Sequence, residues 1–393
     1  MDNNTRPAGR LSGVSALFDG GRLTLARKLA GLKKVDLAGL VGKSAASVTS
    51  WENNATKPSS ATVAQLALAL EVEPQFFLPA GTREPAVSQP HFRSLRSTTQ
   101  TAQDQAAAYG RLAGDIGALL EKSVEFPTRN LPSIPVDASA PSADGPEKAA
   151  RAAREFFDLP IGPVSHMIRL VERAGVLVVF SPPQTASIDA FSMEVEGRPI
   201  IVLNPTKDDY YRQRFDVAHE LGHLIMHADS EPGSRIAEDQ ANRFASEFLT
   251  PTEQVKNDLP RTTTERGWER LAQLKEHWGV SLQALLFRAR ALGVMSEVTY
   301  RNAMMRVSAN GWRRAEPGQV MVVEMTSLIP RAVDVLEQAG MHATDLVKGP
   351  GLPLSIFDTI AARLPRKPAT MPDSAEQSAD RGIVAALIGA SER

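Results

Sequence analysis

Apolar residues between positions 22 and 78 recur every three or four residues, as they do in amphipathic helices. The pattern is interrupted at Gly31, Gly42 and Pro58, where helices tend to end or begin. It predicts a compact domain of four or five short helices over residues 22–80. The polar residues 1–21 before it are expected to form a flexible tail.

Residues 81–145 have a different pattern, with helix-forming residues between two Pro-rich pieces. The stretch "TAQDQAAAYGRLAGDIGALLEKS" has apolar residues at helical spacing, whereas "FPTRNLPSIPVDASAPSADGP" contains five prolines. We therefore expect a connector made of one helix between two flexible or extended pieces.

From Pro146 the pattern alternates between the helical and strand periods. Two helical stretches precede three strand-like runs, "VLVVF", "DAFSMEV" and "PIIVLN", and helices return from Tyr210. This predicts an α+β domain over residues 146–295. Residues 296–393 contain one apolar run and two short helical patterns, which indicate a small mixed region of unknown role. The expected chain is multidomain and mainly α, with a small sheet in its central domain.

Composition excludes several kinds of site. The 393 residues include no cysteine, so a metal site must use histidine and carboxylate ligands. The 44 basic and 45 acidic side chains nearly balance, so a nucleic-acid surface must be local. Without a leader-like start or a long apolar run, the protein is expected to be cytoplasmic and to have no membrane partner.

Residues 37–70 have the pattern of a helix-turn-helix. Gly42 would end one helix in the left-handed conformation, and Ser44 would open a second helix that Val48 and Trp51 anchor. A helical bundle that binds protein would show a similar pattern. The stretch resembles the XRE (lambda repressor and Cro) helix-turn-helix family through Ala26, Arg27, Gly31, Leu32, Leu37, Ala38, Gly42, Ser44, Ser47, Val48, Glu52, Pro58, Leu66 and Ala67. The resemblance covers the whole domain and implies its fold and binding to operator DNA.

The expected DNA contacts are short or flexible side chains. Where the family usually carries glutamine and long polar residues, this sequence has Lys34, Ala45 and Ala46, and alanine offers at most a contact to a thymine methyl group. We therefore expect DNA binding that is weak for a monomer and depends on a homodimer. The candidate contacts are Lys34, Lys43 and Lys57 to phosphates, and Ser44, Ser47, Thr49 and Ser50 on the outward face near the bases.

The stretch "AHELGHLIMH" carries a candidate metal site. His219 and His223 are four residues apart, so both imidazoles project from one helix face and can bind one ion. Glu220 flanks them and suits a general base that acts on water. His227 lies about 12 Å along the helix from His219, too far for a shared ion, so it is a core histidine or a cleft residue. Asp216 is expected to cap the helix.

A third ligand must come from elsewhere, and residues 238–251 supply the candidates. Glu238 begins a stripe with Ala241, Asn242 and Ala245, whose small residues favour close helix packing. Asn242 could accept a hydrogen bond from a liganding imidazole. Asp239 is the next-best ligand, although it points away from the stripe.

The stretches "RFDVAHELGHLIMH" and "EDQANRFASEFLTP" resemble the ImmA/IrrE family of zinc-dependent endopeptidases, and the match extends over about residues 150–295. The resemblance implies Zn²⁺ held by His219, His223 and Glu238, with Glu220 as the catalytic base. It also implies cleavage of an XRE-type repressor, which induces stress, DNA-damage or mobile-element genes.

Zincin chemistry needs two further parts that the sequence leaves open. An edge strand, for which "PIIVLN" is the candidate, would pair with the extended substrate. Tyr210, Tyr211 and His227 are alternative candidates for stabilising the oxyanion. The main hypothesis is a DNA-bound zinc endopeptidase. The alternative is a transcription regulator whose peptidase-like domain is a sensor or dimerisation module with little or no proteolysis.

Overall fold

The computed structural model describes residues 7–79, 90–92, 99–182, 190–206, 209–228, 230, 234–313, 315–318 and 321–364. Most of the first Pro-rich piece of the predicted connector therefore lies outside the described residues. Within them, the fold is mainly helical with one small sheet, as the sequence predicts. No described helix combines the length and the apolar character that crossing a bilayer requires.

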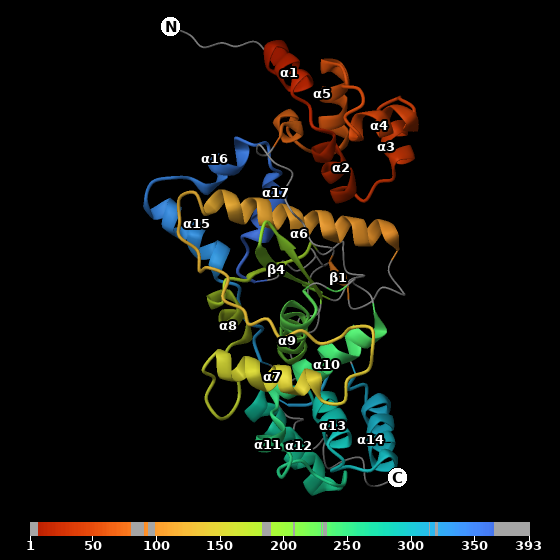
Figure 1. The fold of residues 1–393 in the computed structure, drawn as a ribbon, viewed down its shortest axis with the longest axis vertical. Helices are drawn as coiled ribbons and strands as arrows, with labels where there is room; N and C mark the ends of the chain where they lie inside the picture. Colours follow the sequence, from red (N-terminus) through yellow and green to blue (C-terminus); the bar gives the residue numbers. More distant parts are fainter. Residues whose placement is uncertain are drawn as a thin grey trace, which may run out of the picture. The chain divides into compact units, whose positions relative to one another are not determined.

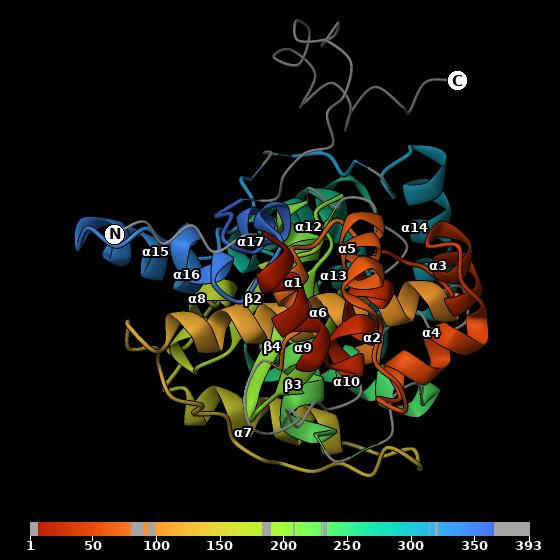
Figure 2. The same ribbon diagram turned by 90° about the horizontal axis from the view of Figure 1, so that it is seen from above.

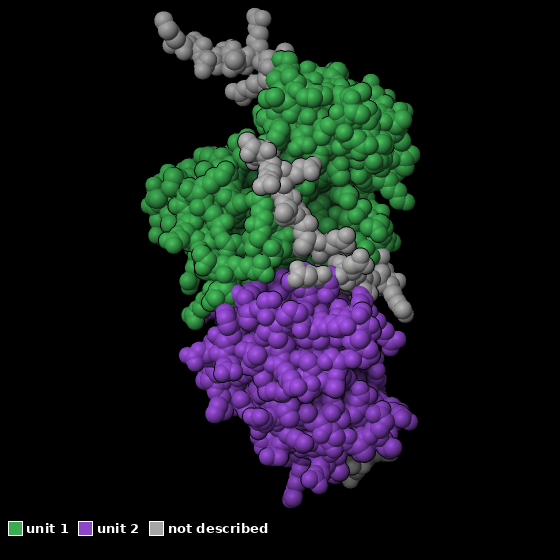
Figure 3. Space-filling view, viewed as in Figure 1, with its two compact units in different colours: residues 1–130, 171–206, 325–366 green, residues 131–170, 207–324, 367–393 purple. Residues whose placement is uncertain are grey.

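The chain divides into two compact units, and each is built from segments that are distant in sequence (Figure 3). Unit 1 combines residues 1–130, 171–206 and 325–366. Unit 2 combines residues 131–170, 207–324 and 367–393. The sequence predicts contiguous domains, and this interleaving could not be inferred from local patterns.

Unit 1 begins with a cluster of short helices (Figure 1). Gly42 is left-handed, with φ 61°, and Ser44 caps the second helix of the helix-turn-helix by accepting a hydrogen bond from the Ser47 amide. Both features follow the sequence expectation. The elements are α1 (Pro7–Ala16), α2 (Gly20–Leu29), α3 (Lys34–Leu40), α4 (Ala45–Glu52), α5 (Ser60–Ala69) and the 3₁₀ helix η1 (Pro74–Phe77).

The prediction of a flexible tail over residues 1–21 is wrong for its second half. Residues 7–16 form α1, and Val14 and Phe18 are buried in the core of unit 1. The Phe18 ring contacts that of Phe77, and the Asp19 amide donates to the carbonyl of Phe77. Leu11, Val14 and Phe18 recur at helical spacing, but they are few among polar residues, and their burial depends on the later helices.

A four-stranded sheet forms the other part of unit 1. It contains β1 (His91–Phe92), β2 (Leu177–Phe180), β3 (Ala190–Val195) and β4 (Arg198–Leu203), in the order β1-β3-β4-β2. Strand β4 pairs antiparallel with β3 and parallel with β2. The prediction that "PIIVLN" is an edge strand is therefore wrong, because both edges of β4 already carry ladder hydrogen bonds.

Helix α6 (Gln100–Leu120) lies across this sheet and packs closely on it (Figures 1 and 2). Three glycines make the close approach possible. A Cβ atom on Gly110, Gly114 or Gly117 would lie 2.4–2.7 Å from side-chain atoms of Met193, Val195 or Leu177. These glycines recur at helical spacing, so they form one smooth face toward the sheet.

Helix α6 also binds the N-terminal helices. The Arg22 guanidinium is buried and lies 2.7 Å from the Asp115 carboxylate, and its Nε atom donates to the carbonyl of Phe76. Gln105 donates to the carbonyl of Leu29 at 2.8 Å. The prediction of α6 as a spacer between two domains is therefore wrong. It is amphipathic because one face belongs to the core of unit 1.

The C-terminal part of unit 1 is helical in the residues described, rather than mixed. Helices α15 (Leu328–Gln338), α16 (Ala343–Lys348) and α17 (Leu354–Ile360) add apolar side chains to the same core. The buried Glu172 carboxylate accepts hydrogen bonds from the amides of Ser327 and Leu328 at 2.8 and 2.9 Å. It thereby caps the first turn of α15.

Unit 2 is helical in the residues that the structure describes, and α10 packs against both α9 and α7. Its helices are α7 (Gly145–Phe156), α9 (Tyr210–Met226), α10 (Arg235–Leu249), α11 (Thr252–Val255), α12 (Glu265–Trp278), α13 (Leu282–Ala291) and α14 (Glu297–Ala309). Helix α8 (Met167–Arg173) begins in unit 2 and ends in unit 1.

The extended piece before α7 is tied to the end of α9. Amides of Ile134 and Val136 donate to the carbonyls of Ile225 and Met226 at 3.0 and 3.2 Å. Of the two predicted alternatives, flexible or extended, the segment is the extended one. Its backbone amides donate hydrogen bonds to the C-terminal end of α9.

One buried ion pair links α9 to the segment that precedes α15. Arg214 and Glu324 are almost fully buried, and their Nη1 and Oε1 atoms lie 2.6 Å apart. The same carboxylate accepts hydrogen bonds from the amides of Met167 and Ile168. Glu324 is therefore an integral part of unit 2.

Replacing Glu324 with alanine should destabilise unit 2 by about 3–5 kcal/mol, because the Arg214 charge would stay buried without its carboxylate. Thermal melting followed by circular dichroism would measure the change. Glu337→Ala, at an exposed ion pair with His342, is the matched control and should change the melting temperature little. Equal melting temperatures for the two variants would contradict this account.

Candidate metal centre and DNA-binding helix

Three side chains from α9 and α10 converge in unit 2. His219 and His223 project one turn apart from α9, and Glu238 projects from the first turn of α10. The two Nε2 atoms lie 3.1 Å apart. The Glu238 oxygens lie 3.3 Å from Nε2 of His219 and 3.2 Å from Nε2 of His223. The three side chains thus form a triangle in which each imidazole faces a different oxygen of Glu238, and one ligand atom from each residue lies within 4.8 Å of the others.

The nearest distances between these three side chains are close to those of a zinc site. Tetrahedral zinc with bonds of 2.0–2.1 Å to imidazole nitrogen and carboxylate oxygen separates its ligand atoms by about 3.3 Å. Three protein ligands would leave a fourth position for water or substrate, as catalytic zinc sites do. The residues present therefore fit a catalytic zinc ion in both chemistry and spacing.

Close packing of the two helices brings Glu238 to the histidines. A Cβ atom on Gly222 would lie 2.9 Å from the Phe244 ring, so only glycine permits this approach. Ala241 and Ala245 on the facing stripe of α10 are fully buried. Ser234 caps α10 by accepting hydrogen bonds from the amides of Ile236 and Ala237. The predicted small-residue stripe is the contact surface.

The cap of α9 differs from the prediction. Asp209 accepts a hydrogen bond from the Arg212 amide and begins the helix, whereas Asp216 lies within it and is buried. The helix begins at Tyr210, where the sequence predicts that helices return, and Tyr210, Tyr211 and Arg214 have partners of their own in unit 2.

The electrostatics of the triangle suit a cation. Burial raises the pKa of Glu238, but hydrogen bonds and charge from His219 and His223 outweigh it and hold that pKa well below its usual range. Glu238 is therefore a carboxylate at neutral pH. Glu220 follows His219 in sequence, and its side chain is fully buried, as are those of both histidines. The Glu238 side chain is 17% exposed.

The two liganding imidazoles each have an outer partner. Asn242 Oδ1 lies 3.1 Å from Nδ1 of His219, so this amide can accept the Nδ1 proton and leave Nε2 for the metal. His227 lies behind His223, with their Nδ1 atoms 3.1 Å apart. Burial, with the nearby His223, lowers the pKa of His227 to about 4, so its ring is neutral at pH 7.

Three candidate residues lie away from the triangle. Asp239 is exposed and is not part of the cluster. Tyr210 and Tyr211 precede His219 by at least eight residues, about 12 Å along the helix. The Arg214 guanidinium contacts the Tyr210 ring, and the Lys275 ammonium lies 4.4 Å from the centre of the Tyr211 ring. Burial raises the pKa of Tyr211 to about 12, so its hydroxyl is a poor proton donor at neutral pH.

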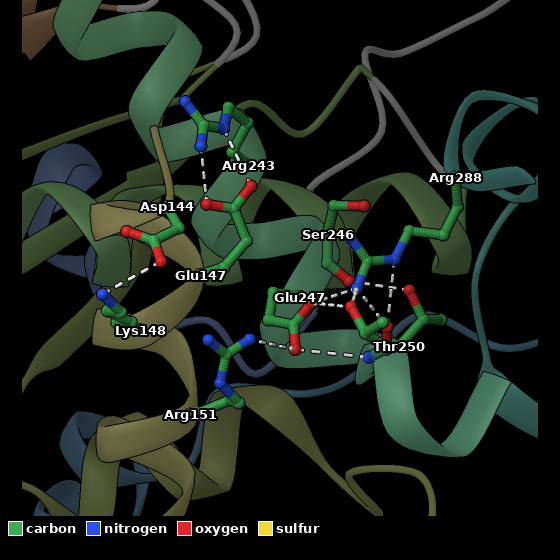
Figure 4. A network of polar contacts seen from close by, with 10 residues as sticks. Asp144, Glu147, Lys148, Arg151, Arg243, Ser246, Glu247, Thr250 and Arg288 are labelled. Carbon is green, nitrogen blue, oxygen red and sulfur yellow. Dashed lines mark hydrogen bonds and ion pairs between the residues drawn. The ribbon is translucent and has the colours of Figure 1, made fainter. Parts of the chain in front are cut away.

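A polar network holds the far end of α10 in place (Figure 4). The fully buried Glu247 carboxylate binds Arg288 of α13 and lies 3.1 Å from Arg151 of α7. One turn earlier, Arg243 binds Glu147 of α7 through two hydrogen bonds of 2.7 and 2.8 Å. These contacts fix α10 along its length, and hence the position of Glu238.

In unit 1, the predicted DNA contacts lie on α4 and beside it, and they are exposed to different degrees. Lys43, Ser44 and Lys57 are exposed, and Ser47, Thr49 and Ser50 are partly exposed. Lys34 differs, because its ammonium lies 3.2 Å from the buried Glu52 carboxylate, which also binds Arg27. The charge of Lys34 is therefore offset by an internal carboxylate. The Lys57 ammonium donates to the neutral carbonyl of Ala16, so Lys43 and Lys57 are the stronger phosphate candidates.

Comparison with known families finds one match over each of the two regions. Residues 23–77 match a helix-turn-helix family model, and residues 171–290 match the model of the IrrE N-terminal-like domain, a peptidase family. The chain joins an XRE-type helix-turn-helix domain to an IrrE-like peptidase domain. No curated protein matches the sequence. The helix-turn-helix supports binding to double-stranded DNA, and the IrrE-like domain is that of a metallopeptidase-like family that is generally zinc-dependent.

One residue of the IrrE-like site, Gln240, escapes sequence reasoning. Its side chain lies 2.7 Å from His227 and donates to the carbonyls of Asp137 and Ala140. Its spacing from Glu238 carries no recognised motif, and its partners lie about 100 residues away. The only local signal that this side of the site has further residues is His227, which repeats the four-residue spacing of His219 and His223.

His223→Ala should remove zinc from the IrrE-like domain, because no described neighbour can replace the lost Nε2 atom. Elemental analysis of the purified protein should give about one zinc per chain for the wild type and little for the variant. His342→Ala, an exposed histidine on unit 1, is the control and should keep the wild-type zinc content. Equal zinc in all three proteins would exclude this assignment.

Proposed function

We propose that this protein is a transcription regulator that binds an operator through α4 and cleaves a protein substrate with a zinc-dependent endopeptidase site. The proposed substrate is an XRE-type repressor, and its cleavage would induce stress, DNA-damage or mobile-element genes. The triangle of His219, His223 and Glu238 is the observation that carries the proposal, because two imidazole nitrogens and a carboxylate whose nearest atoms lie 3.1–3.3 Å apart suit zinc.

Each residue has a defined part in peptide hydrolysis. A zinc ion held by the triangle would supply a Lewis acid that polarises the scissile carbonyl and acidifies a water molecule. The Glu220 carboxylate would accept a proton from the attacking water and pass it to the leaving amine. Asn242 holds the His219 ring by its Nδ1 atom. Access is expected from the side of Glu238, the ligand that keeps some exposure.

The buried carboxylate of Glu220 favours an enzyme over a structural domain. Burying a carboxylate costs free energy, and a role as proton acceptor in hydrolysis would account for its place beside the metal ligands. The alternative, a sensor or dimerisation module without proteolysis, needs the metal ligands at most and has no use for this base.

Fusion of the two domains would increase the rate of cleavage at the operator. Repressors with a related helix-turn-helix occupy the same kind of DNA site, so a peptidase bound there meets its substrate at a high effective concentration. The proposed homodimer would span two half-sites of a palindrome, one helix α4 in each major groove. Selective cleavage would then need little affinity between the catalytic site and the repressor itself.

Glu220→Gln should abolish cleavage while zinc content and DNA binding stay unchanged, because the amide keeps the shape of the side chain but cannot accept the proton of water. The test incubates zinc-loaded protein with XRE-type repressors encoded near its gene and follows the fragments by mass spectrometry. In cells, the variant should occupy the promoter without inducing the controlled genes. Induction equal to wild type would exclude proteolysis as the output and support the sensor alternative.

Lys43→Ala and Lys57→Ala should each weaken operator binding and reduce the slope of log affinity against log salt by about one, since each lysine releases about one counterion. The operator would first be identified by a promoter-wide binding assay with the full chain. Lys348→Ala, an exposed lysine on α16, is the control and should bind as wild type. A wild-type salt slope in both α4-region variants would argue against this DNA interface.

A further inference from the structure

Behind the metal triangle, three buried side chains form one line of hydrogen bonds. His223, His227 and Gln240 are each no more than 1% exposed. His223 Nδ1 lies 3.1 Å from His227 Nδ1, and His227 Nε2 lies 2.7 Å from Gln240 Oε1. Gln240 Nε2 donates to the carbonyls of Asp137 and Ala140 at 2.9 and 3.2 Å. The line thus runs from the extended segment before α7 to a candidate metal ligand.

The two carbonyls determine which way the Gln240 amide faces. A carbonyl oxygen can only accept hydrogen bonds, so the group that meets Asp137 and Ala140 must be the NH₂ donor. In the reversed orientation, the amide oxygen would face two carbonyl oxygens with no proton between them. Gln240 Oε1 therefore faces His227, because only this orientation of the amide satisfies both carbonyls.

The direction of every other proton follows from the Gln240 oxygen. Since Oε1 is an acceptor, His227 must carry its proton on Nε2. A neutral imidazole has one proton, which leaves Nδ1 of His227 bare and able to accept. His223 must then carry its proton on Nδ1, and its Nε2 lone pair points into the triangle.

We infer that His227 and Gln240 are positioning residues that fix His223 in its Nδ1–H tautomer, and so keep its Nε2 atom ready to bind zinc. This assignment rests on the zinc site proposed above and differs from the oxyanion role considered for His227. His227 is fully buried behind the ligand and touches His223 on the side away from Glu238, so it has no path to a substrate carbonyl.

The opposite proton arrangement would prevent ligation. If His227 donated from Nδ1, His223 Nδ1 would have to accept, and its single proton would occupy Nε2, the atom that faces His219 and Glu238. Metal ligands commonly use a carboxylate or a carbonyl as their outer acceptor. Here a neutral imidazole does so, and it adds no negative charge, so more of the positive charge of a bound cation is available to the substrate.

The tautomers can be read directly in the zinc-loaded full chain. Long-range ¹H–¹⁵N correlation spectra of protein labelled at histidine distinguish protonated from bare ring nitrogens, and the chain has only seven histidines. We expect a proton on Nε2 alone in His227 and on Nδ1 alone in His223, with assignment by the His227 variants below. A proton on Nδ1 of His227 would overturn the inference.

Zinc affinity, measured by competition with a chromophoric chelator, tests the consequence. His227→Phe keeps the ring shape but removes the acceptor, and should weaken zinc binding by about 10–100-fold. His227→Asn places an amide oxygen near the position of Nδ1 and should recover most of this loss. Gln240→Leu should also weaken binding, because His227 is then free to take either tautomer. Equal losses in His227→Phe and His227→Asn would show that shape alone matters and would reject the inference.

A structural control separates positioning from general loss of stability. Val217 is fully buried on the same helix, on the side away from the metal face, so Val217→Ala should lower the melting temperature and leave zinc affinity unchanged. If the wild type bound no zinc, the proposed function itself would fail. If the wild type bound zinc and His227→Phe bound it as tightly, only the present inference would fail.

Discussion

The close approach of helices α9 and α10 is the constraint on which the metal centre depends. The triangle needs donor atoms about 3.3 Å apart, which two helices can supply only if their backbones lie unusually near each other. Gly222 removes the side chain that would otherwise meet Phe244, and Ala241 and Ala245 keep the facing stripe flat. Because the two helices pack so closely, a small shift of α10 would move Glu238 away from the histidines. Helix α10 therefore also needs contacts that hold it from its other side. The ion pairs of Glu247 and Arg243 with α7 and α13 do this (Figure 4).

Features set by spacing along one helix could be predicted from the sequence. Gly42, which ends one helix, and Ser44, which caps the next, indicate the turn of a helix-turn-helix. The four-residue spacing of His219 and His223 places two imidazoles on one helix face. Glu238 could be predicted as a candidate ligand for a similar reason, since it begins a helical stripe of small residues. In each case the physical rule acts within a few residues, so one sequence is enough.

Features that depend on distant segments could not be predicted in this way. The "PIIVLN" run is strand-like in any position, and only the pairing of β2 with β4 makes it internal. Helix α6 has an amphipathic pattern that fits a spacer as well as a core helix, and its glycines gain meaning only once Met193 and Val195 lie against them. The role of Gln240 needs the carbonyls of residues 137 and 140, about 100 residues earlier in the chain.

The position of α6 also connects the helix-turn-helix mechanically to the rest of unit 1. A helix-turn-helix on a loose tether would respond to DNA without affecting its neighbours. Here the buried Arg22 binds both Asp115 on α6 and the carbonyl of Phe76 in η1, so α2, η1 and α6 share one buried cation. Because α6 in turn lies on the sheet through its glycines, a shift of the DNA-binding helices would require the α6 contacts to break or to move with them. The helix-turn-helix, α6 and the sheet are therefore expected to move as one body within unit 1.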